Sequence, residues 1–177
     1  MRYFMSIWVF CLMLVSPLSP SVAEAKGGIM LLELKSGIVK IRLREDIAPG
    51  HVERIKQLAA EKFYDGVIFH RVIEGFMAQT GDPTGTGMGG SDYPDLKAEF
   101  SDEPFLRGMI GMARAQHPDS ANSQFFICFE DSEFLNRQYT IWGEVIEGME
   151  YIDAIERGEP PENPDRIVSM RMAEDSE

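Results

Sequence analysis

The stretch FHRVIEGFMAQTGD, residues 69–82, is the most informative part of the sequence for the fold and the site. Residues 67–72 are rich in apolar side chains and predict a β-strand, yet Arg71 stands in the middle of that run. Arginine is mostly found exposed to solvent, so its place within an apolar run is unusual. Phe76, Met77 and Gln79 follow Arg71 closely. An arginine among apolar residues, close to a methionine and a glutamine, makes this stretch a candidate for chemistry.

Short apolar runs on both sides of this stretch predict further strands. Residues 29–34 and 38–43 flank a loop that contains glycine, which predicts a hairpin. In the second run, Val39, Ile41 and Leu43 share one face. The other predicted strands are residues 108–113, 124–129, 139–145 and 167–172.

Two segments have the spacing of short helices. The first starts near Pro49, which the first turn of a helix tolerates, and has an apolar stripe over residues 52–59. His51 and Arg54 lie between the stripe positions and are expected to face outward. The second helix is predicted around residues 149–155. Many short strands with two helices indicate a mainly antiparallel barrel or sandwich capped by helices.

A second unusual stretch, ANSQFFI, occupies residues 121–127. Together with residues 69–82, it resembles the cyclophilin family, in particular its short bacterial exported members, and the resemblance extends over residues 29–172. It implies a mainly β fold, a closed eight-stranded antiparallel barrel capped by two helices, with the active site on its outer face. It also implies a peptidyl-prolyl cis-trans isomerase that assists the folding of exported proteins.

The resemblance implies roles for individual side chains as well. Arg71 would be the catalytic residue, and Gln79 would orient it. The peptide backbone of the substrate would be held by Ala113, Arg114 and Gln124. The substrate proline would occupy an apolar pocket lined by Phe76, Met77, Phe126 and Leu135, with Phe134 and Tyr139 at the rim.

Three positions depart from the best-known eukaryotic cyclophilins. Phe134 stands where many of them carry tryptophan, so tight binding of cyclosporin is in doubt. Tyr139 stands where many carry histidine, and Arg114 where many carry asparagine. None of these differences removes the arginine or the apolar pocket, so isomerase activity is still expected.

The residue types suit this reaction. A prolyl bond resists rotation through amide resonance, with a barrier of roughly 18–20 kcal/mol, and a guanidinium can donate a hydrogen bond to the nitrogen as resonance is lost. Lysine would lack the planar fork. Because no bond breaks, we expect neither a metal nor another cofactor. The partners would be proline-containing segments of unfolded or partly folded proteins.

Two other functions remain open at this stage. A chaperone or peptide-binding module could use the same scaffold, although a pure binder has no need of Arg71. A hydrolase or metal enzyme has little local support, since Ser120 and Ser123 lack the glycines of a nucleophile elbow. The three histidines form no short-spaced ligand pair, and His70 is expected to be a hydrogen-bonded core residue.

The glycine-rich segment 85–90, GTGMGG, matches a dinucleotide fingerprint in its spacing only. That fingerprint requires a helix to begin directly after the glycines. The following residues, Ser91-Asp92-Tyr93-Pro94, cannot open a helix. We therefore expect a loop at the rim of the fold.

The first residues predict a cleaved signal peptide. Residues 3–15 are almost wholly apolar, a run of about 13 where a helix that crosses a bilayer needs roughly 20. Ala23 and Ala25 then supply the small residues of a cleavage site. We expect residues 1–25 to be removed, leaving a single domain of residues 26–177 with a short acidic tail. The destination would be the periplasm, without stable insertion in a membrane.

Composition agrees with a soluble exported domain. The net charge of −12 argues against a nucleic-acid partner, because phosphate binding needs clustered lysine and arginine. After cleavage Cys128 is the single cysteine, so no internal disulfide can form, and its apolar neighbours predict a buried small hydrophobe. We expect a monomer.

Overall fold

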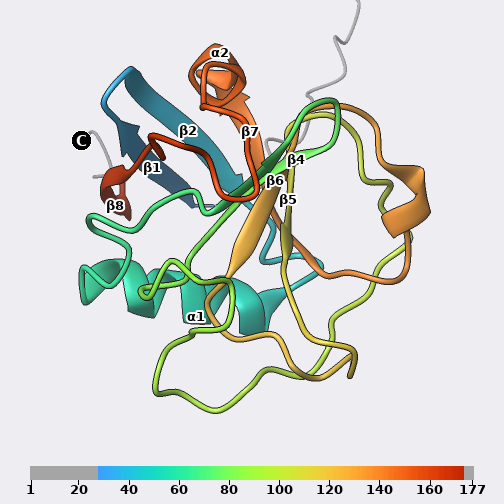
Figure 1. Ribbon diagram of the computed structural model, residues 1–177. Helices are drawn as coiled ribbons and strands as arrows, with labels where there is room; N and C mark the ends of the chain where they lie inside the picture. Colours follow the sequence, from blue (N-terminus) through green and yellow to red (C-terminus); the bar gives the residue numbers. More distant parts are fainter. Residues whose placement is uncertain (1–27, 174–177) are drawn as a thin grey trace, which may run out of the picture.

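The computed structural model describes residues 28–173, so the predicted signal peptide and the end of the acidic tail lie outside the described part. Eight strands form one antiparallel sheet in the order β3-β4-β6-β5-β7-β2-β1-β8, and the sheet curls around a core (Figure 1). In chain order the elements are β1 (Ile29–Leu34), β2 (Gly37–Leu43), α1 (Pro49–Ala60), β3 (Arg71–Ile73), β4 (Met77–Thr80), β5 (Met109–Met112), β6 (Phe125–Cys128), the 3₁₀ helix η1 (Glu133–Leu135), β7 (Ile141–Glu147), α2 (Met149–Asp153) and β8 (Ile167–Met172).

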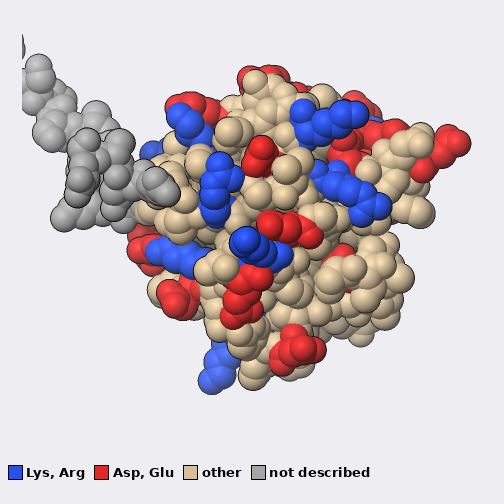
Figure 2. Space-filling model, turned by 90° about the vertical axis from the view of Figure 1, so that its left-hand side faces the viewer, with Lys and Arg blue, Asp and Glu red and all other residues tan. Residues whose placement is uncertain are grey.

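The predicted hairpin of β1 and β2 is confirmed. The two strands pair in antiparallel register from Ile29 opposite Arg42 to Leu34 opposite Gly37. The inner face of β2 buries Val39, Ile41 and Leu43, as their alternation predicts. On the side of the molecule that carries β1 and β8, basic and acidic side chains lie among one another (Figure 2). Such mixed surface charges favour solubility rather than one charged partner.

The closed barrel predicted above is not formed by a continuous ladder. Within residues 28–173, β3 and β8 are the two edges of the sheet. Isolated bridges join the edge regions, namely Ile68 with Arg166 and Val72 with Gly158. Pro160 and Pro161 follow Gly158 and cannot donate backbone hydrogen bonds, so this segment cannot extend a ladder along β3. The fold is therefore a curled, incompletely closed sheet.

The two predicted helices lie at opposite ends of the curled sheet (Figure 1). The apolar stripe of α1 is buried as predicted, but His51 and Arg54 are buried too, contrary to the prediction. Arg54 is buried because it donates to the Pro94 carbonyl at 2.9 Å and its guanidinium lies over the Tyr93 ring. His51 is buried beside Glu99, which accepts hydrogen bonds from the backbone N–H groups of Gly50 and His51 and approaches His51 Nδ1 to 2.6 Å. This carboxylate satisfies donors that the first turn of a helix leaves open.

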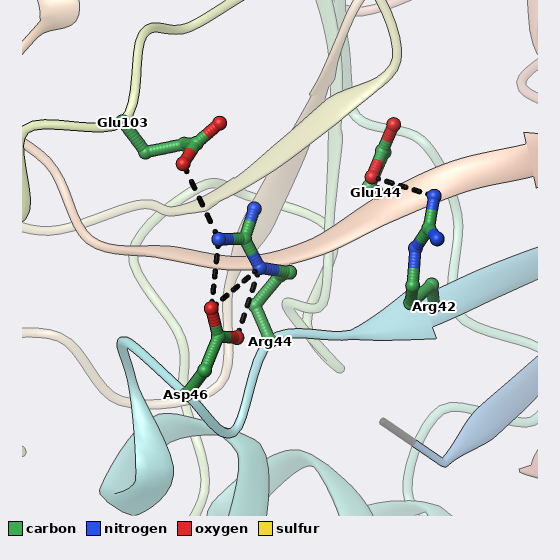
Figure 3. Close-up of polar contacts among 5 residues, drawn as sticks. All are labelled: Arg42, Arg44, Asp46, Glu103 and Glu144. Atoms are coloured by element: carbon green, nitrogen blue, oxygen red, sulfur yellow. Dashed lines mark hydrogen bonds and ion pairs between the residues drawn. The ribbon is translucent and has the colours of Figure 1, made fainter. Parts of the chain in front are cut away.

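An arginine cluster fixes the connection from β2 to α1 (Figure 3). Arg44 donates from Nε and Nη2 to Asp46, both at 2.9 Å, and from Nη2 to Glu103 at 3.3 Å. These hydrogen bonds hold the pKa of the Asp46 carboxyl below its usual range. The neighbouring pair of Arg42 and Glu144 joins β2 to β7 (Figure 3). The cluster therefore ties three segments of the chain together at one end of the sheet.

The other strand predictions differ from the structure mainly at their ends. The strand predicted at residues 67–72 is reduced to β3, which begins at Arg71, with an isolated bridge at Ile68. The short strand β4 was not predicted, because three of its four residues are buried and no alternation marks it. Within residues 28–173, no helix is long and apolar enough to cross a membrane.

Candidate active site

A pocket of about 410 Å³ opens on the outer face of the sheet and gathers the predicted site residues. Its lining consists of Arg71, Phe76, Met77, Gln79, Ala113, Arg114, Phe126, Phe134, Leu135, Gln138 and Tyr139, which we call the site pocket. Gln124 is the one predicted residue outside this lining. It lines an adjoining hollow of about 440 Å³, together with Gln79, Ala113, Arg114 and the glycine-rich loop.

Strand register aligns three of the site residues in a row. Arg71 on β3 lies opposite Gln79 on β4, and Gln79 lies opposite Phe126 on β6. Directly opposed residues of antiparallel strands project from the same face. The row therefore places a guanidinium, an amide and an aromatic ring side by side on one surface.

The floor of the site pocket is apolar. Phe126 is buried between the ring of Phe105, 5.8 Å away and stacked, and the ring of Tyr139, 5.7 Å away and edge-on. Gly111 lies opposite Phe126 on β5, where a Cβ atom would come within 2.4 Å of the Phe126 ring. Glycine at this position leaves room for the ring, so Gly111 shapes the floor.

The rim of the pocket comes from η1 and the residues after it. Phe134 remains 63% exposed, and its ring lies 5.2 Å from that of Phe76. The next residue, Leu135, turns inward and is buried. Gln138, a lining residue that sequence reasoning missed, donates its side-chain amide to the Phe134 carbonyl at 2.7 Å. It therefore holds one side of the rim in place.

Arg71 has a partner that was not predicted. Its Nε atom donates to Glu159 Oε2 at 2.8 Å, and 41% of the arginine side chain is exposed. Gln79 was expected to orient Arg71, but its Nε2 atom donates to Gln124 Oε1 at 2.9 Å. No side-chain hydrogen bond joins Gln79 to Arg71 among residues 28–173. The two residues pair through the backbones of β3 and β4, so an orienting effect of Gln79 would act through its position beside the arginine.

Gln124 connects the site pocket to the adjoining hollow. Its Nε2 atom donates to the carbonyls of Gly87 and Gly89, at 3.0 and 2.8 Å. The chain of hydrogen bonds therefore runs from Gln79 through Gln124 to the glycine-rich loop. Both hollows share this polar boundary.

The side chain of Arg114 contacts its own chain. It donates to the carbonyls of Gln138, Ala115 and Gln116 over 2.8–3.2 Å. Its guanidinium also lies over the Tyr139 ring, 4.6 Å from the ring centroid. These contacts brace Tyr139 at the rim. Contacts of Arg114 with a substrate backbone stay a prediction.

Asp82 organises the glycine-rich loop. It accepts hydrogen bonds from the backbone N–H groups of Thr84, Gly87 and Gly89 and from the Thr84 hydroxyl. Burial by itself raises the pKa of Asp82, but the hydrogen bonds from Thr84 and the glycines outweigh it and lower the pKa to about 2. The carboxylate is therefore charged at neutral pH, and the loop is fixed around it.

The buried histidine and cysteine next to the site do not take part in it. His70 is buried, but neither ring nitrogen has a hydrogen-bond partner among the described residues, which contradicts the predicted hydrogen-bonded histidine. Cys128 is buried as predicted, and burial raises the pKa of its thiol to about 12. It is an inert core residue.

The arrangement can hold a compact apolar ring beside a cation. The buried side chains of Met77, Phe126 and Leu135 exclude water, while the guanidinium of Arg71 keeps donors available at the edge. A pyrrolidine ring fits such a pocket in size and polarity. Hydrogen bonds from the guanidinium could then reach the amide that precedes the ring.

Comparison with known proteins identifies the family of the chain. The model of the cyclophilin type peptidyl-prolyl cis-trans isomerase family matches residues 29–172. A probable peptidyl-prolyl cis-trans isomerase of Brucella suis is 52% identical over 163 residues, with 83% of each chain covered. A peptidyl-prolyl cis-trans isomerase of Synechococcus elongatus is 36% identical over 148 residues, which cover 82% of this chain and 97% of that protein.

Solved structures are similar as well. A cyclophilin from Hirschia baltica superposes with a TM-score of 0.77 at 30% identity, covering 85% of this chain and 76% of the other. A cyclophilin type isomerase from Cryptosporidium parvum, solved in the presence of the dipeptide Ala-Pro, gives a TM-score of 0.77 at 28% identity, covering 83% and 99%. Family model, relatives and fold thus lead to one assignment: the chain belongs to the cyclophilin family of peptidyl-prolyl cis-trans isomerases.

Proposed function

We propose that Arg71 is the catalytic residue of this isomerase and that the site pocket binds the proline ring of an X-Pro bond. As the amide twists, its nitrogen regains a lone pair, and a guanidinium N–H can donate to it. This interaction is absent from the planar ground state. It therefore lowers the barrier to rotation instead of merely tightening binding.

The other residues of the site have supporting roles in this proposal. Phe76, Met77, Phe126 and Leu135 grip the ring while the preceding carbonyl swings, and they keep water from competing for the donors of Arg71. Ala113, Arg114 and Gln124 hold the backbone of the peptide, with Phe134 and Tyr139 at the rim. Gln79 stands beside Arg71 and limits its movement.

One observation carries the proposal above all. Arg71 is in line with Gln79 and Phe126 across three strands, and all three residues line the site pocket. A solvated surface arginine would not need a buried aromatic floor beside it. A peptide-binding module without turnover would not need the arginine, so the enzyme is favoured over the chaperone.

The experiment is isomerisation of a short Ala-Pro-Phe peptide by the wild-type protein and by Arg71→Ala. We expect the substitution to lower kcat/KM by at least about tenfold, because it removes the donor to the amide nitrogen. Arg42→Ala, which removes an arginine on β2, serves as the control. Wild-type activity in a folded Arg71→Ala variant would refute the assignment. Binding of proline peptides by the wild type without acceleration would favour the chaperone.

We further propose that the protein acts on exported proteins in the periplasm. The proposal rests on the apolar run of residues 3–15 and the small residues Ala23 and Ala25. Mass spectrometry of the protein from the cell envelope should find an amino terminus at Lys26. An intact Met1 on a membrane-bound protein would contradict it.

The domain is also proposed to act as a monomer that binds cyclosporin weakly. The support for a monomer is that the exposed large apolar side chains of the described residues lie on different elements, such as Ile38 on β2, Phe134 on η1 and Val168 on β8. Light scattering during size exclusion would give the mass of one chain. A dimer at micromolar concentration would refute this part.

A further inference from the structure

The ion pair between Arg71 and Glu159 brings together residues 88 positions apart in the chain. Arg71 is at the start of β3, and Glu159 belongs to the loop between α2 and β8. The carboxylate contacts Nε, on the inner side of the guanidinium. The terminal nitrogens, Nη1 and Nη2, have no protein partner among the described residues, and the side chain lines the site pocket.

Backbone pairing next to the ion pair sets its position. Val72 and Gly158 exchange two backbone hydrogen bonds, of 2.8 and 2.9 Å. In an antiparallel bridge the residues on either side also face each other, so Glu159 is brought opposite Arg71. Gly158 has a φ of +151°, and a Cβ atom there would come within 2.5 Å of Pro161. The approach of the loop to β3 thus depends on glycine.

The rest of the loop is held independently of Arg71. Asp165 accepts a hydrogen bond from the Glu156 backbone, and Glu156 accepts one from that of Asn163, both at 2.9 Å. Arg157 lies over the Phe129 ring, 4.2 Å from its centroid, and pairs with Glu74. These contacts fix the position of the loop that carries Glu159, without any contribution from Arg71.

From this geometry we infer that Glu159 is a positioning residue for catalysis: it holds the Nε edge of Arg71 so that the terminal N–H groups are directed at the substrate amide. The inference rests on the proposed catalytic role of Arg71. Arginine has many rotamers, and fixing one edge removes most of them before substrate arrives. The pair acts on orientation, since an ion pair exposed to this degree adds little to stability.

The test compares Glu159→Ala, Glu159→Gln and Arg71→Ala in the full-length protein. Glu159→Ala should lower kcat about tenfold, as expected when a reacting group loses its alignment. KM should change less than about twofold, because Glu159 does not line the site pocket. Glu159→Gln keeps an acceptor oxygen and should retain most of the activity. The Tm of each variant should stay close to that of the wild type.

Glu162→Ala is the matched control, because it removes the same charge from the same loop at an exposed position. It should leave kcat and KM unchanged. The Arg71 Nε–H signal in NMR spectra reports the contact directly. It should exchange slowly with water in the wild type and in Glu162→Ala, and rapidly in Glu159→Ala.

Each other outcome overturns the inference in a distinguishable way. Unchanged or higher kcat in Glu159→Ala, with Arg71→Ala inactive, would refute the positioning role and leave the catalytic arginine in place. An equal loss in Glu159→Gln and Glu159→Ala would refute positioning through the hydrogen bond. Wild-type activity of Arg71→Ala would refute both the catalytic arginine and the inference.

Discussion

Gln79 and Gln124 face each other across the boundary of two hollows, with Gln79 Nε2 donating to Gln124 Oε1 at 2.9 Å. This contact leaves the Gln124 amide nitrogen directed at the carbonyls of Gly87 and Gly89. Because Gln124 accepts a hydrogen bond from Gln79 and donates to the glycine-rich loop, hydrogen bonds connect the site pocket to that loop.

Gln124→Ala should disconnect them. The glycine-rich loop loses two hydrogen bonds and Gln79 loses its acceptor, so we expect kcat/KM to fall about fivefold, mostly through a higher KM. Faster hydrogen exchange at Gly89 would report the freed loop. Gln116→Ala, at an exposed position nearby, should change neither quantity. An unaltered KM in Gln124→Ala would contradict the connection.

Phe134→Trp should strengthen cyclosporin binding. Phe134 is largely exposed at the rim and its ring lies beside that of Phe76, so a larger ring can extend into solvent. The indole adds contact area and an N–H donor, for which we expect about tenfold tighter binding by calorimetry. Phe100→Trp, an exposed aromatic outside the site pocket, is the control. Equal affinity of Phe134→Trp and wild type would exclude this explanation.

Arg114→Ala should weaken substrate binding without slowing turnover. The substitution removes the cation from the Tyr139 ring and the donors to the Gln138 carbonyl. A looser rim should raise KM about threefold with kcat nearly unchanged. Arg137→Ala removes an arginine that pairs with Asp102 and should have no such effect. A fall in kcat alone would assign Arg114 a different role.

Asp82→Asn should alter acid stability. The folded-state pKa of about 2 lies below the ordinary value of 3.8, so the carboxylate stabilises the fold above pH 4 and loses this effect as pH falls toward 2. The shift corresponds to about 2 kcal/mol. In urea unfolding, Asp82→Asn should be less stable than wild type by this amount at pH 7. The difference should shrink by pH 2, and a constant difference would show that charge is not the cause.

Periodicity predicted the parts of the fold that have one buried and one exposed face. The hairpin of β1 and β2 and the stripe of α1 follow from it. It failed for β4, whose residues are buried on both faces, and for η1, which is too short to show a period. The prediction placed His51 and Arg54 outside because nothing in the sequence of α1 indicates that Glu99 contacts His51 or that Tyr93 and Pro94 contact Arg54.

The resemblance to cyclophilins predicted which residues form the candidate site. It did not predict the contacts that these residues make with one another. Arg71, Gln79 and Phe126 are at dissimilar sequence spacings, and only strand register shows that they form a row. Glu159 lies in a loop with three prolines, where a glutamate is ordinarily solvated. Its contact with Arg71 depends on the backbone bridge at Gly158, which sequence patterns do not reveal.

The hydrogen bonds of Asp82 explain why a sequence that matches a nucleotide fingerprint in spacing need not bind a phosphate. In such sites, successive backbone N–H groups surround an anion that comes from solution. Here the N–H groups of Thr84, Gly87 and Gly89 already surround an anion supplied by the chain itself. The anion-binding groups of the loop are therefore occupied by Asp82, and their hydrogen bonds stabilise the conformation of the loop beside the site.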